Sequence, residues 1–363
     1  MTQRPFTVAL IIPTGIGAAI GGYAGDALPV ARAVGSICDR LITHPNVLNG
    51  AQLYWPIPNA LYVEGYGLDQ FAAGRWGLRP VHGNRIGLIL DQAIEPDLRI
   101  RHLQAADAAR ATLGLSLTDT VLTDQPLGVT LNTAASGATW GTIQNPDSLL
   151  RAADKLIYEK GATAIAVVVR FPENISSEAL CNYRHGQGVD PLAGAEAVIS
   201  HLVVRTFGVP CAHAPALSPL PLDPSLSPRS AAEELGHTFL PCVLVGLSRA
   251  PQFIRGALQT HDISTDAVDA VVIPESACGG SAVLSWSQTH TPTQIITVAD
   301  NHTTLNVTPQ SLGLSVWRAQ SYSESIGMLV AMRAGINPDA LTAKMLPIAL
   351  QQNSMGDAKP ANV

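Results

Sequence analysis

Hydrophobic and polar positions alternate along this chain as apolar runs and short polar loops, and the first run is the clearest. Thr7–Pro13 is apolar enough for a buried strand, Thr14–Asp26 is rich in glycine, and Ala27–Arg40 has the pattern of a helix. Strand, glycine-rich turn and helix follow in the order that builds an anion site in α/β proteins, because glycine lets the backbone approach a ligand and free N–H groups at a helix start attract negative charge. The pattern predicts a binding loop at residues 14–26.

The rest of the chain continues this exchange of apolar strands and helices. Further strands are predicted at Arg85–Leu90, Ala164–Val169, Phe239–Val245, Ala270–Ile273 and Gln294–Val298. Helices are predicted at Ile100–Leu113, from a cap at Asn145 to Lys160, at Pro191–Phe207 after a cap at Asp190, and at Ser321–Ala334. Val129 is placed at the end of another strand, and Asn132–Thr142 is expected to be a loop of small residues.

Helices followed by wholly apolar strands are typical of a parallel sheet covered on both faces. We therefore expect an α/β protein with a largely parallel sheet, helices on both faces and two lobes around a cleft. The Pro- and Ser-rich stretch 215–228 is predicted to separate an N-terminal lobe (1–214) from a C-terminal lobe (229–345), with a disordered tail at 346–363. Ligands of open α/β sheets bind beyond the carboxyl ends of the strands, where the polar loops of this chain fall.

Composition narrows the class of protein. The chain has 363 residues, and only 14% of them are charged, against about 25% in a typical soluble domain. This low share of charged residues suggests that much of the surface is buried between subunits. We therefore expect a homo-oligomer. The net charge of -6 argues against a nucleic-acid partner, which would require a basic face.

Lysine is scarce, with four Lys beside 18 Arg. The first lysine, Lys155, lies far beyond the glycine-rich loop, so that loop is not a P-loop. Schiff-base chemistry requires a desolvated lysine. Lys155 and Lys160 fall on the polar side of a predicted helix, and Lys344 and Lys359 fall near the tail. Pyridoxal-phosphate and class I aldolase chemistry are therefore disfavoured.

The five cysteines are scattered and include no Cys-x-x-Cys. This favours a reducing, cytoplasmic compartment over a disulfide framework. Thr7–Gly25 carries no charge, but Pro13 and five glycines interrupt it, so neither a signal peptide nor a membrane span is predicted.

The glycine-rich loop supplies the first candidate ligand-binding residues: Thr14, Gly15, Gly17, Gly21 and Gly22. Its third glycine comes one residue too late for the dinucleotide fingerprint, and no apolar strand leads to Asp39, the candidate ribose-binding acid. An anion-binding loop, a dinucleotide site and a structural turn remain open alternatives, and no cofactor is implied strongly.

Cys278 follows a predicted strand within Glu275–Ser281. Nearby N–H groups, including those of Gly279 and Gly280, would stabilise a thiolate or bind an oxyanion, which makes Cys278 a candidate nucleophile and Glu275 a candidate acid or base. The alternative is a small packed thiol.

Further candidates follow other strands. Asp300 and His302 offer acid–base chemistry beside Asn301, a candidate ligand contact, although Asp and Asn also stabilise turns. His44 is a candidate proton partner and Asn46 a candidate ligand contact.

Other polar residues complete the candidate site. Ser248 and Arg249 are candidates to hold a carboxylate or phosphate, unless Arg249 forms a surface ion pair. Glu64 and Asp69 are weaker acid candidates. Cys211 and His213, with His185 or His201, match no strong metal-ligand spacing, so no metal is predicted.

Several of these segments together resemble a known family. They are Leu41–Asn49, Val189–Glu196, Pro210–Pro215, Gly246–Pro251 and Pro274–Gly280. The family occurs in cyanobacteria and other bacteria and is catalogued as a domain of unknown function. The resemblance covers nearly the whole chain and implies a cytoplasmic protein of one domain family, but it assigns no catalytic residue.

The leading hypothesis is a cytoplasmic isomerase, lyase or amide hydrolase that acts on a small anionic metabolite, with Cys278 as nucleophile or acid–base group. A non-catalytic metabolite-binding regulator, an assembly factor and a dinucleotide oxidoreductase are the alternatives.

Overall fold

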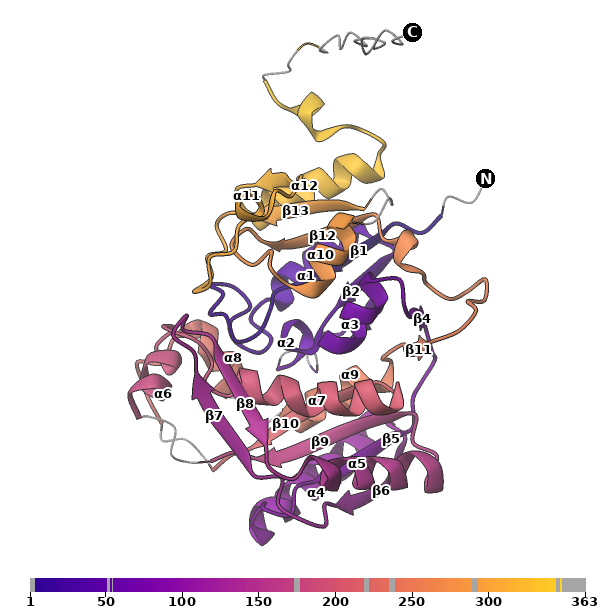
Figure 1. Cartoon of the computed structure of the whole chain (residues 1–363), viewed down its shortest axis with the longest axis vertical. Helices are drawn as coiled ribbons and strands as arrows, with labels where there is room; N and C mark the ends of the chain where they lie inside the picture. The colour runs from indigo at the N-terminus through magenta and orange to yellow at the C-terminus, as the bar shows by residue number, and fades with distance from the viewer. Residues whose placement is uncertain are drawn as a thin grey trace, which may run out of the picture.

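Two parallel β-sheets organise the molecule, and helices cover them (Figure 1). The computed structural model describes residues 4–50, 53, 55–172, 177–218, 222–234, 239–288, 293–343 and 347. Two short antiparallel pairs accompany the sheets. The architecture confirms the predicted α/β class, with its parallel strands divided between two sheets.

The larger sheet has six strands, and all neighbouring strands are parallel. Its order is β14 (Trp317–Ala319), β13 (Gln294–Val298), β12 (Ala270–Pro274), β1 (Thr7–Leu10), β2 (Arg40–Thr43) and β3 (Ala60–Tyr62). The chain leaves β1 toward β2 on one side, while β12 pairs with β1 on the other. The β1–β12 boundary is therefore a topological switch point, where an open α/β sheet forms a crevice beyond its carboxyl edge.

The smaller sheet has four parallel strands in the order β10 (Cys211–Ala216), β9 (Ala164–Arg170), β5 (Ile86–Leu90) and β6 (Leu117–Leu122). One antiparallel pair joins β7 (Val129–Thr133) to β8 (Thr139–Ile143), and the other joins β4 (Gly77–Arg79) to β11 (Gln252–Ile254).

The longer helices are α1 (Leu28–Ile37), α3 (Gly65–Ala72), α4 (Pro96–Leu113), α5 (Pro146–Asp154), α6 (Ser177–Arg184), α7 (Ala193–Phe207), α8 (Pro228–Glu234), α9 (Phe239–Ser248), α10 (Ser281–Gln288) and α12 (Tyr322–Arg333). The short ones are α2 (Pro45–Leu48), α11 (Pro309–Leu312), a π-helical turn (Lys155–Glu159) and two 3-10 turns (Thr265–Ala267 and Pro338–Leu341). In Figure 1, α2, α3 and α7 lie between the two sheets, and α3 packs against both α7 and α10.

The burial of strand β1 on both faces of its sheet explains why its sequence is wholly apolar. Val8 and Leu10 pack into one hydrophobic cluster, whereas Ala9 joins a different cluster on the opposite face. All three side chains are fully buried. A parallel sheet buried on both faces needs continuous apolar strands, which is the pattern the sequence shows. Residues 7–10 are thus an inner strand of the folded protein.

Two local predictions are wrong. Phe239–Val245 lies in helix α9, not in a strand, and most of its side chains are buried. A short apolar run fits either element when it is buried on all sides. Val129 begins a strand rather than ending one, and most of the predicted loop 132–142 belongs to the β7–β8 hairpin.

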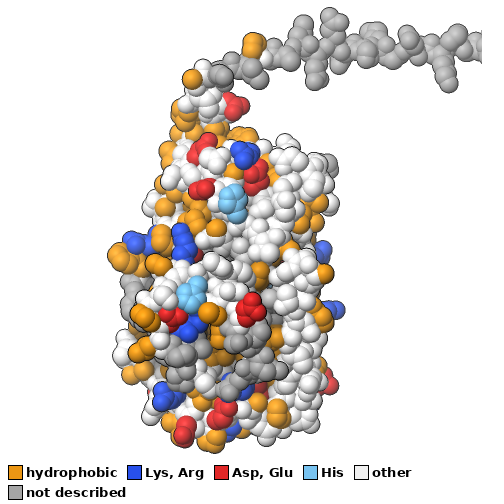
Figure 2. All heavy atoms as spheres, turned by 90° about the vertical axis from the view of Figure 1, so that its left-hand side faces the viewer, with side chains coloured by type: hydrophobic (Ala, Val, Ile, Leu, Met, Phe, Trp, Pro, Cys, Tyr) orange, Lys and Arg blue, Asp and Glu red, His pale blue; other side chains and the backbone are white. Residues whose placement is uncertain are grey.

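The six-stranded sheet takes strands from both ends of the chain, so its strands do not follow the predicted division at 215–228. That division and the two-lobed shape stay predictions. The predicted tail lies outside the described residues apart from Pro347. On the face shown in Figure 2, acidic and basic side chains are scattered among uncharged ones, without a continuous patch of one sign.

Candidate functional site

A cavity of about 480 Å³ lies where the loops of the larger sheet meet helix α7. Loops that follow β1, β2, β3 and β12 line one part of it, and α7 with the carboxyl half of β10 lines another. The cavity therefore opens at the β1–β12 switch point, the place in this topology where a ligand is expected.

The charged lining of this cavity is one-sided. Among the described lining residues there are five carboxylates and three histidines, and neither Lys nor Arg: Glu64, Asp69, Asp190, Glu196, Glu233, His44, His201 and His213. Burial of several like charges raises their free energy unless a counter-charge is near. The cavity is thus built to favour positive charge.

Glu64 and His201 form the core of a first cluster. Glu64 Oε1 lies 2.9 Å from His201 Nε2, and the Glu64 side chain is only 3% exposed. Its other oxygen accepts a hydrogen bond from the Gly67 N–H and so caps helix α3. A Cβ at residue 65 would lie 3.0 Å from His201 Nε2, so Gly65 allows the imidazole to approach the start of α3.

Asp69 completes this cluster one turn along α3. Burial raises the pKa of the Asp69 carboxyl, against the opposing effect of His201. For His201, burial lowers the pKa, but the Glu64 and Asp69 carboxylates outweigh it and the net shift is upward. The pair of carboxylates therefore keeps His201 charged to a higher pH than usual.

A second cluster lies at the start of α7. Asp190 Oδ1 accepts a hydrogen bond from the Leu192 N–H at 2.8 Å. Glu196 lies 3.6 Å from His213 on β10, measured from Oε2 to Nε2. Glu233 accepts a hydrogen bond of 2.6 Å from the Tyr183 hydroxyl. Glu196 lies close enough to Asp190 and Glu233 to repel them, as the pKa shifts of Asp190 and Glu233 show.

Burial is the largest cause of those shifts. It raises the pKa of Asp190 well above the usual range, with added repulsion from Glu196 and Glu233. Burial and the charge of Glu196 raise the pKa of Glu233 to about 7, against the Tyr183 hydrogen bond. A cation beside these groups would reverse the shifts, because it stabilises the ionised carboxylates.

Residues predicted from sequence line this cavity: Thr14, His44, Asn46, Gly279 and Gly280, with the weaker acid candidates Glu64 and Asp69. His44 is buried, and burial lowers its pKa to about 4. Its Nε2 accepts a hydrogen bond from the Ile12 N–H at 3.0 Å, so the neutral ring fastens β1 to β2. Asn46 donates to the Gly21 carbonyl at 2.6 Å. These two side chains support the cavity wall.

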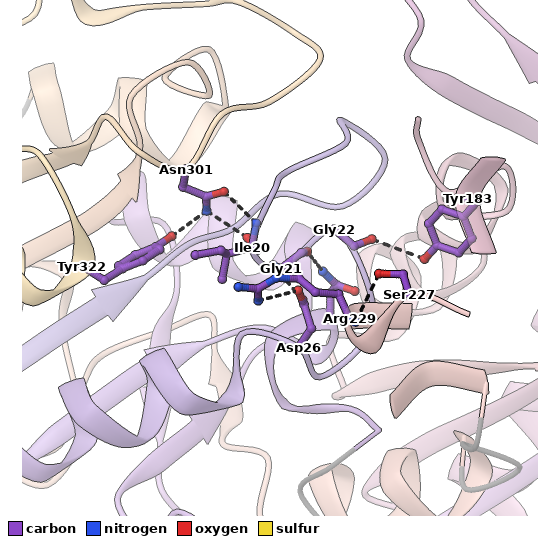
Figure 3. Close-up of polar contacts among 10 residues, drawn as sticks. Ile20, Gly21, Gly22, Asp26, Tyr183, Ser227, Arg229, Asn301 and Tyr322 are labelled. Atoms are coloured by element: carbon purple, nitrogen blue, oxygen red, sulfur yellow. Dashed lines mark hydrogen bonds and ion pairs between the residues drawn. The ribbon is translucent and has the colours of Figure 1, made fainter. Parts of the chain in front are cut away.

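The glycine-rich loop is tied down by side chains from distant segments (Figure 3). The Ile20 N–H donates to Asn301 Oδ1 at 2.9 Å, and the Gly21 N–H donates to Asp26 Oδ1 at 2.7 Å. The Ala19 N–H donates to the His302 carbonyl at 2.8 Å. The backbone N–H groups of Ala19, Ile20 and Gly21 are thus engaged within the protein. Gly15 and Gly21 have φ of 74° and 87°, which favours glycine at both turns.

A second hollow of about 460 Å³ lies beside this loop and contains Gly17, Gly22 and His302 among its lining residues. Arg229 also lines it, but its Nη1 lies 3.2 Å from Asp26 Oδ2. The structure therefore separates His302 from the cavity that holds His44. Asp300 and Asn301 line neither hollow.

The structure does not give Cys278 the surroundings predicted for a nucleophile. Its side chain is fully buried in a hydrophobic cluster, and burial raises its pKa to about 11. Its N–H donates to the Val307 carbonyl at 2.9 Å. Glu275 pairs with Arg318 at 2.7 Å. These features are those of a packed thiol, and the predicted lowering of the Cys278 pKa is wrong.

Ser248 and Arg249 were placed in a loop after a strand, but Ser248 ends helix α9 and Arg249 follows it. Phe239, at the start of α9, lines the cavity, and a helix of ten residues carries Ser248 roughly 14 Å away along its axis. Neither residue lines either hollow.

The sequence reasoning named Glu64 and Asp69 as acid candidates but missed the second acidic cluster, Asp190, Glu196 and Glu233. On α7, residues 193, 196, 197, 200 and 201 face the cavity with helical spacing. The sequence signal was there, because Glu196, Ser200 and His201 interrupt an otherwise apolar helix along one stripe. Across the described part of the chain, no three His, Cys, Asp or Glu side chains are grouped so as to hold a metal ion.

The family model described as "Protein of unknown function (DUF3326)" matches residues 7–342. The chain belongs to the DUF3326 family. This confirms the resemblance carried by segments such as Leu41–Asn49 and Pro274–Gly280. No solved structure matches the chain.

The chain is also similar to a curated cyanobacterial protein. A protein of Synechococcus sp. (strain ATCC 27144 / PCC 6301 / SAUG 1402/1), named an uncharacterized lipoprotein, is 63% identical over 344 residues, which cover 94% of this chain and 95% of that protein. The name contradicts the expected cytoplasmic location and the hypothesis of a cytoplasmic enzyme for small anions. None of the helices in the described ranges is long and apolar enough to cross a membrane.

Proposed function

We propose that this DUF3326 protein binds a small organic cation, an amine, in the cavity at the β1–β12 switch point. The observation that carries the proposal is the lining of five carboxylates and three histidines without a described Lys or Arg. An ammonium group donates hydrogen bonds to carboxylates and adds positive charge to a lining in which the carboxylates outnumber the histidines.

The surrounding backbone supports a cation over an anion. The starts of α3, α7 and α10 all reach the cavity, and helix starts attract negative charge. Glu64 already caps α3, and Asp190 accepts a backbone hydrogen bond beside the start of α7. The protein's own carboxylates thus lie at the starts of α3 and α7, and a further anion would meet their repulsion.

The size of the cavity supports a small ligand. About 480 Å³ lies within the usual range of small-molecule sites, roughly 300–1,000 Å³. Apolar side chains such as Leu68, Leu192 and Val283 share the lining with the acids. An amine with a short alkyl body matches both features.

We extend the proposal to a location. The lipoprotein name of the Synechococcus relative favours a place at a membrane surface, where the protein would capture the amine rather than transform it. Fractionation of cells into membrane and soluble material, followed by immunoblotting, tests this part. Recovery only in the soluble cytoplasmic fraction would contradict it.

Isothermal titration calorimetry with n-butylamine at pH 8 and low salt tests the binding itself. Glu64→Gln and Glu196→Gln should each weaken binding about tenfold or more, because each removes a charge-assisted hydrogen bond. Glu159→Gln is the matched control, since Glu159 is exposed on the π-helical turn and does not line the cavity. No heat of binding with the wild-type protein would overturn the proposal.

A further inference from the structure

We propose that the ligand is a linear α,ω-diamine that spans both acidic clusters of the cavity. This inference rests on the proposed amine binding and adds the ligand's second charge and its length. One ammonium group would lie beside Glu64 and Asp69, and the other beside Glu196 and its neighbours.

Helix α7 gives a measure of the distance between the clusters. Glu196 belongs to the second cluster and His201 to the first, five residues further along the same helix. Five residues of α-helix rise roughly 7.5 Å. Both residues line the same cavity, so the two clusters are separated along it and do not coincide.

Strand β10 holds the second cluster against α7. His213 Nε2 lies 3.6 Å from Glu196 Oε2, and His213 Nδ1 lies 3.3 Å from Ser200 Oγ. The Glu196 carboxylate is thus paired with β10, whereas the Glu64 carboxylate is paired with His201 of α7.

Glu64 itself points to a ligand. Its side chain is 3% exposed and lines the cavity, and its Oε1 accepts no directed hydrogen bond within the described ranges. Its contact among the described residues is the ion pair with His201 Nε2 at 2.9 Å. A carboxylate oxygen has two lone pairs and can accept a further hydrogen bond. An ammonium N–H in the cavity would supply it.

Apolar side chains in the same cavity suit an alkyl chain. Ala193 and Ala197 lie on the cavity side of α7, and Ala282 and Val283 belong to α10. These side chains are uncharged and offer apolar contacts to methylene groups. An extended tetramethylene or pentamethylene diamine has a length that places its two nitrogens at the two clusters.

Titration calorimetry of the full chain with tri-, tetra-, penta-, hexa- and octamethylenediamine, beside n-butylamine and n-pentylamine, tests the inference. The tetra- or pentamethylene compound should bind about tenfold tighter than its monoamine. Glu196→Gln should abolish this preference, because it weakens diamine binding more than monoamine binding, while Glu159→Gln should change neither affinity.

The outcomes separate the two proposals. Diamines that bind no tighter than monoamines, or affinity that does not depend on chain length, overturn the diamine inference and leave amine binding standing. Absence of binding by every amine overturns both. If Glu196→Gln unfolds the protein, Glu196→Asp replaces it, because the shortened carboxylate should shift the optimum toward longer diamines; an unchanged optimum overturns the inference.

Discussion

Asn301 holds Ile20 by both its backbone N–H and its backbone carbonyl. Asn301 Oδ1 accepts from the Ile20 N–H at 2.9 Å, and Nδ2 donates to the Ile20 carbonyl at 2.8 Å. The same Nδ2 donates to the Tyr322 hydroxyl at 2.8 Å. A loop after β13 thereby fixes the glycine-rich loop after β1, and the fixed loop continues from the cavity wall at Thr14 (Figure 3).

Replacement of Asn301 by Leu should destabilise the protein by about 2–4 kcal/mol, because it leaves buried partners without hydrogen bonds. Urea unfolding followed by circular dichroism measures the change. Asn306→Leu is the matched control, since Asn306 is exposed and follows in the same loop. Equal stability of the two variants would contradict the role of Asn301 in fixing the glycine-rich loop.

His44 predicts a loss of stability in acid. Its pKa is about 4 in the folded protein because of burial, and about 6.5 in an unfolded chain. Between these values the unfolded chain binds a proton that the folded protein does not. The His44 contribution is therefore complete above pH 6.5 and is lost as pH falls toward 4, by about 3 kcal/mol in all.

Urea unfolding of wild type and His44→Gln at pH 7.5, 6, 5 and 4 measures this contribution as a difference. The variant loses stability at pH 7.5, and the gap between the two proteins should narrow toward pH 4. His82→Gln, at an exposed position, should parallel the wild type throughout. A constant gap between wild type and His44→Gln would show that His44 does not titrate between folded and unfolded states.

Amine affinity should rise with pH between about 6 and 8. Burial raises the pKa of Glu233 to about 7, so its carboxyl gains the charge that attracts an ammonium group across this range. The aliphatic ammonium keeps its own proton there. Calorimetry of n-butylamine binding at several pH values should show this slope for wild type and a shallower one for Glu233→Gln.

Tyr183→Phe refines the same experiment. Removal of the hydroxyl takes away the hydrogen bond that lowers the pKa of Glu233. The variant retains the aromatic ring, which packs against Tyr23 with ring centroids 4.6 Å apart. The rise in affinity should therefore move to higher pH in this variant. A profile identical to that of the wild type would show that Glu233 does not govern the slope.

Cys278 should be inert in the folded protein. It is buried and its pKa is raised to about 11, whereas Cys181 is exposed. Since thiolates are the reactive form, a thiol-specific disulfide reagent should modify Cys181 quickly and Cys278 only on unfolding. Cys181→Ser should abolish the fast phase, and Cys278→Ser should leave it unchanged. A fast phase that disappears in Cys278→Ser would restore the predicted nucleophile.

The wholly apolar strands were predictable, because strands such as β1, β5, β9 and β12 are buried on both faces of parallel sheets. Helix α9 was not, because the same composition serves a helix buried on all sides. The division into two sheets was also out of reach, since strand pairing is decided by long-range contacts such as Val8 with Ala270.

The site was predictable in part, for a related reason. Thr14, His44 and Gly279 follow strands, and the general rule for α/β sheets placed them at one edge. The acids of α7 come from a helix of the other sheet, and only packing brings Glu196 and His201 opposite Glu64. The excess of acidic side chains in the cavity therefore emerged only from the structure, and it is the basis for proposing a cation in place of the predicted anion.

One comparison tests the central claim most directly: binding of n-butylamine, n-butanol and butyrate, which have similar size and different charge, measured by ligand-observed NMR at pH 8. The cavity lined by Glu64, Glu196 and Glu233 should bind butylammonium, with weak or undetectable signals for butanol and none for butyrate, and Glu64→Gln should weaken the amine signal. Binding of butyrate equal to or tighter than that of butylamine would contradict the account.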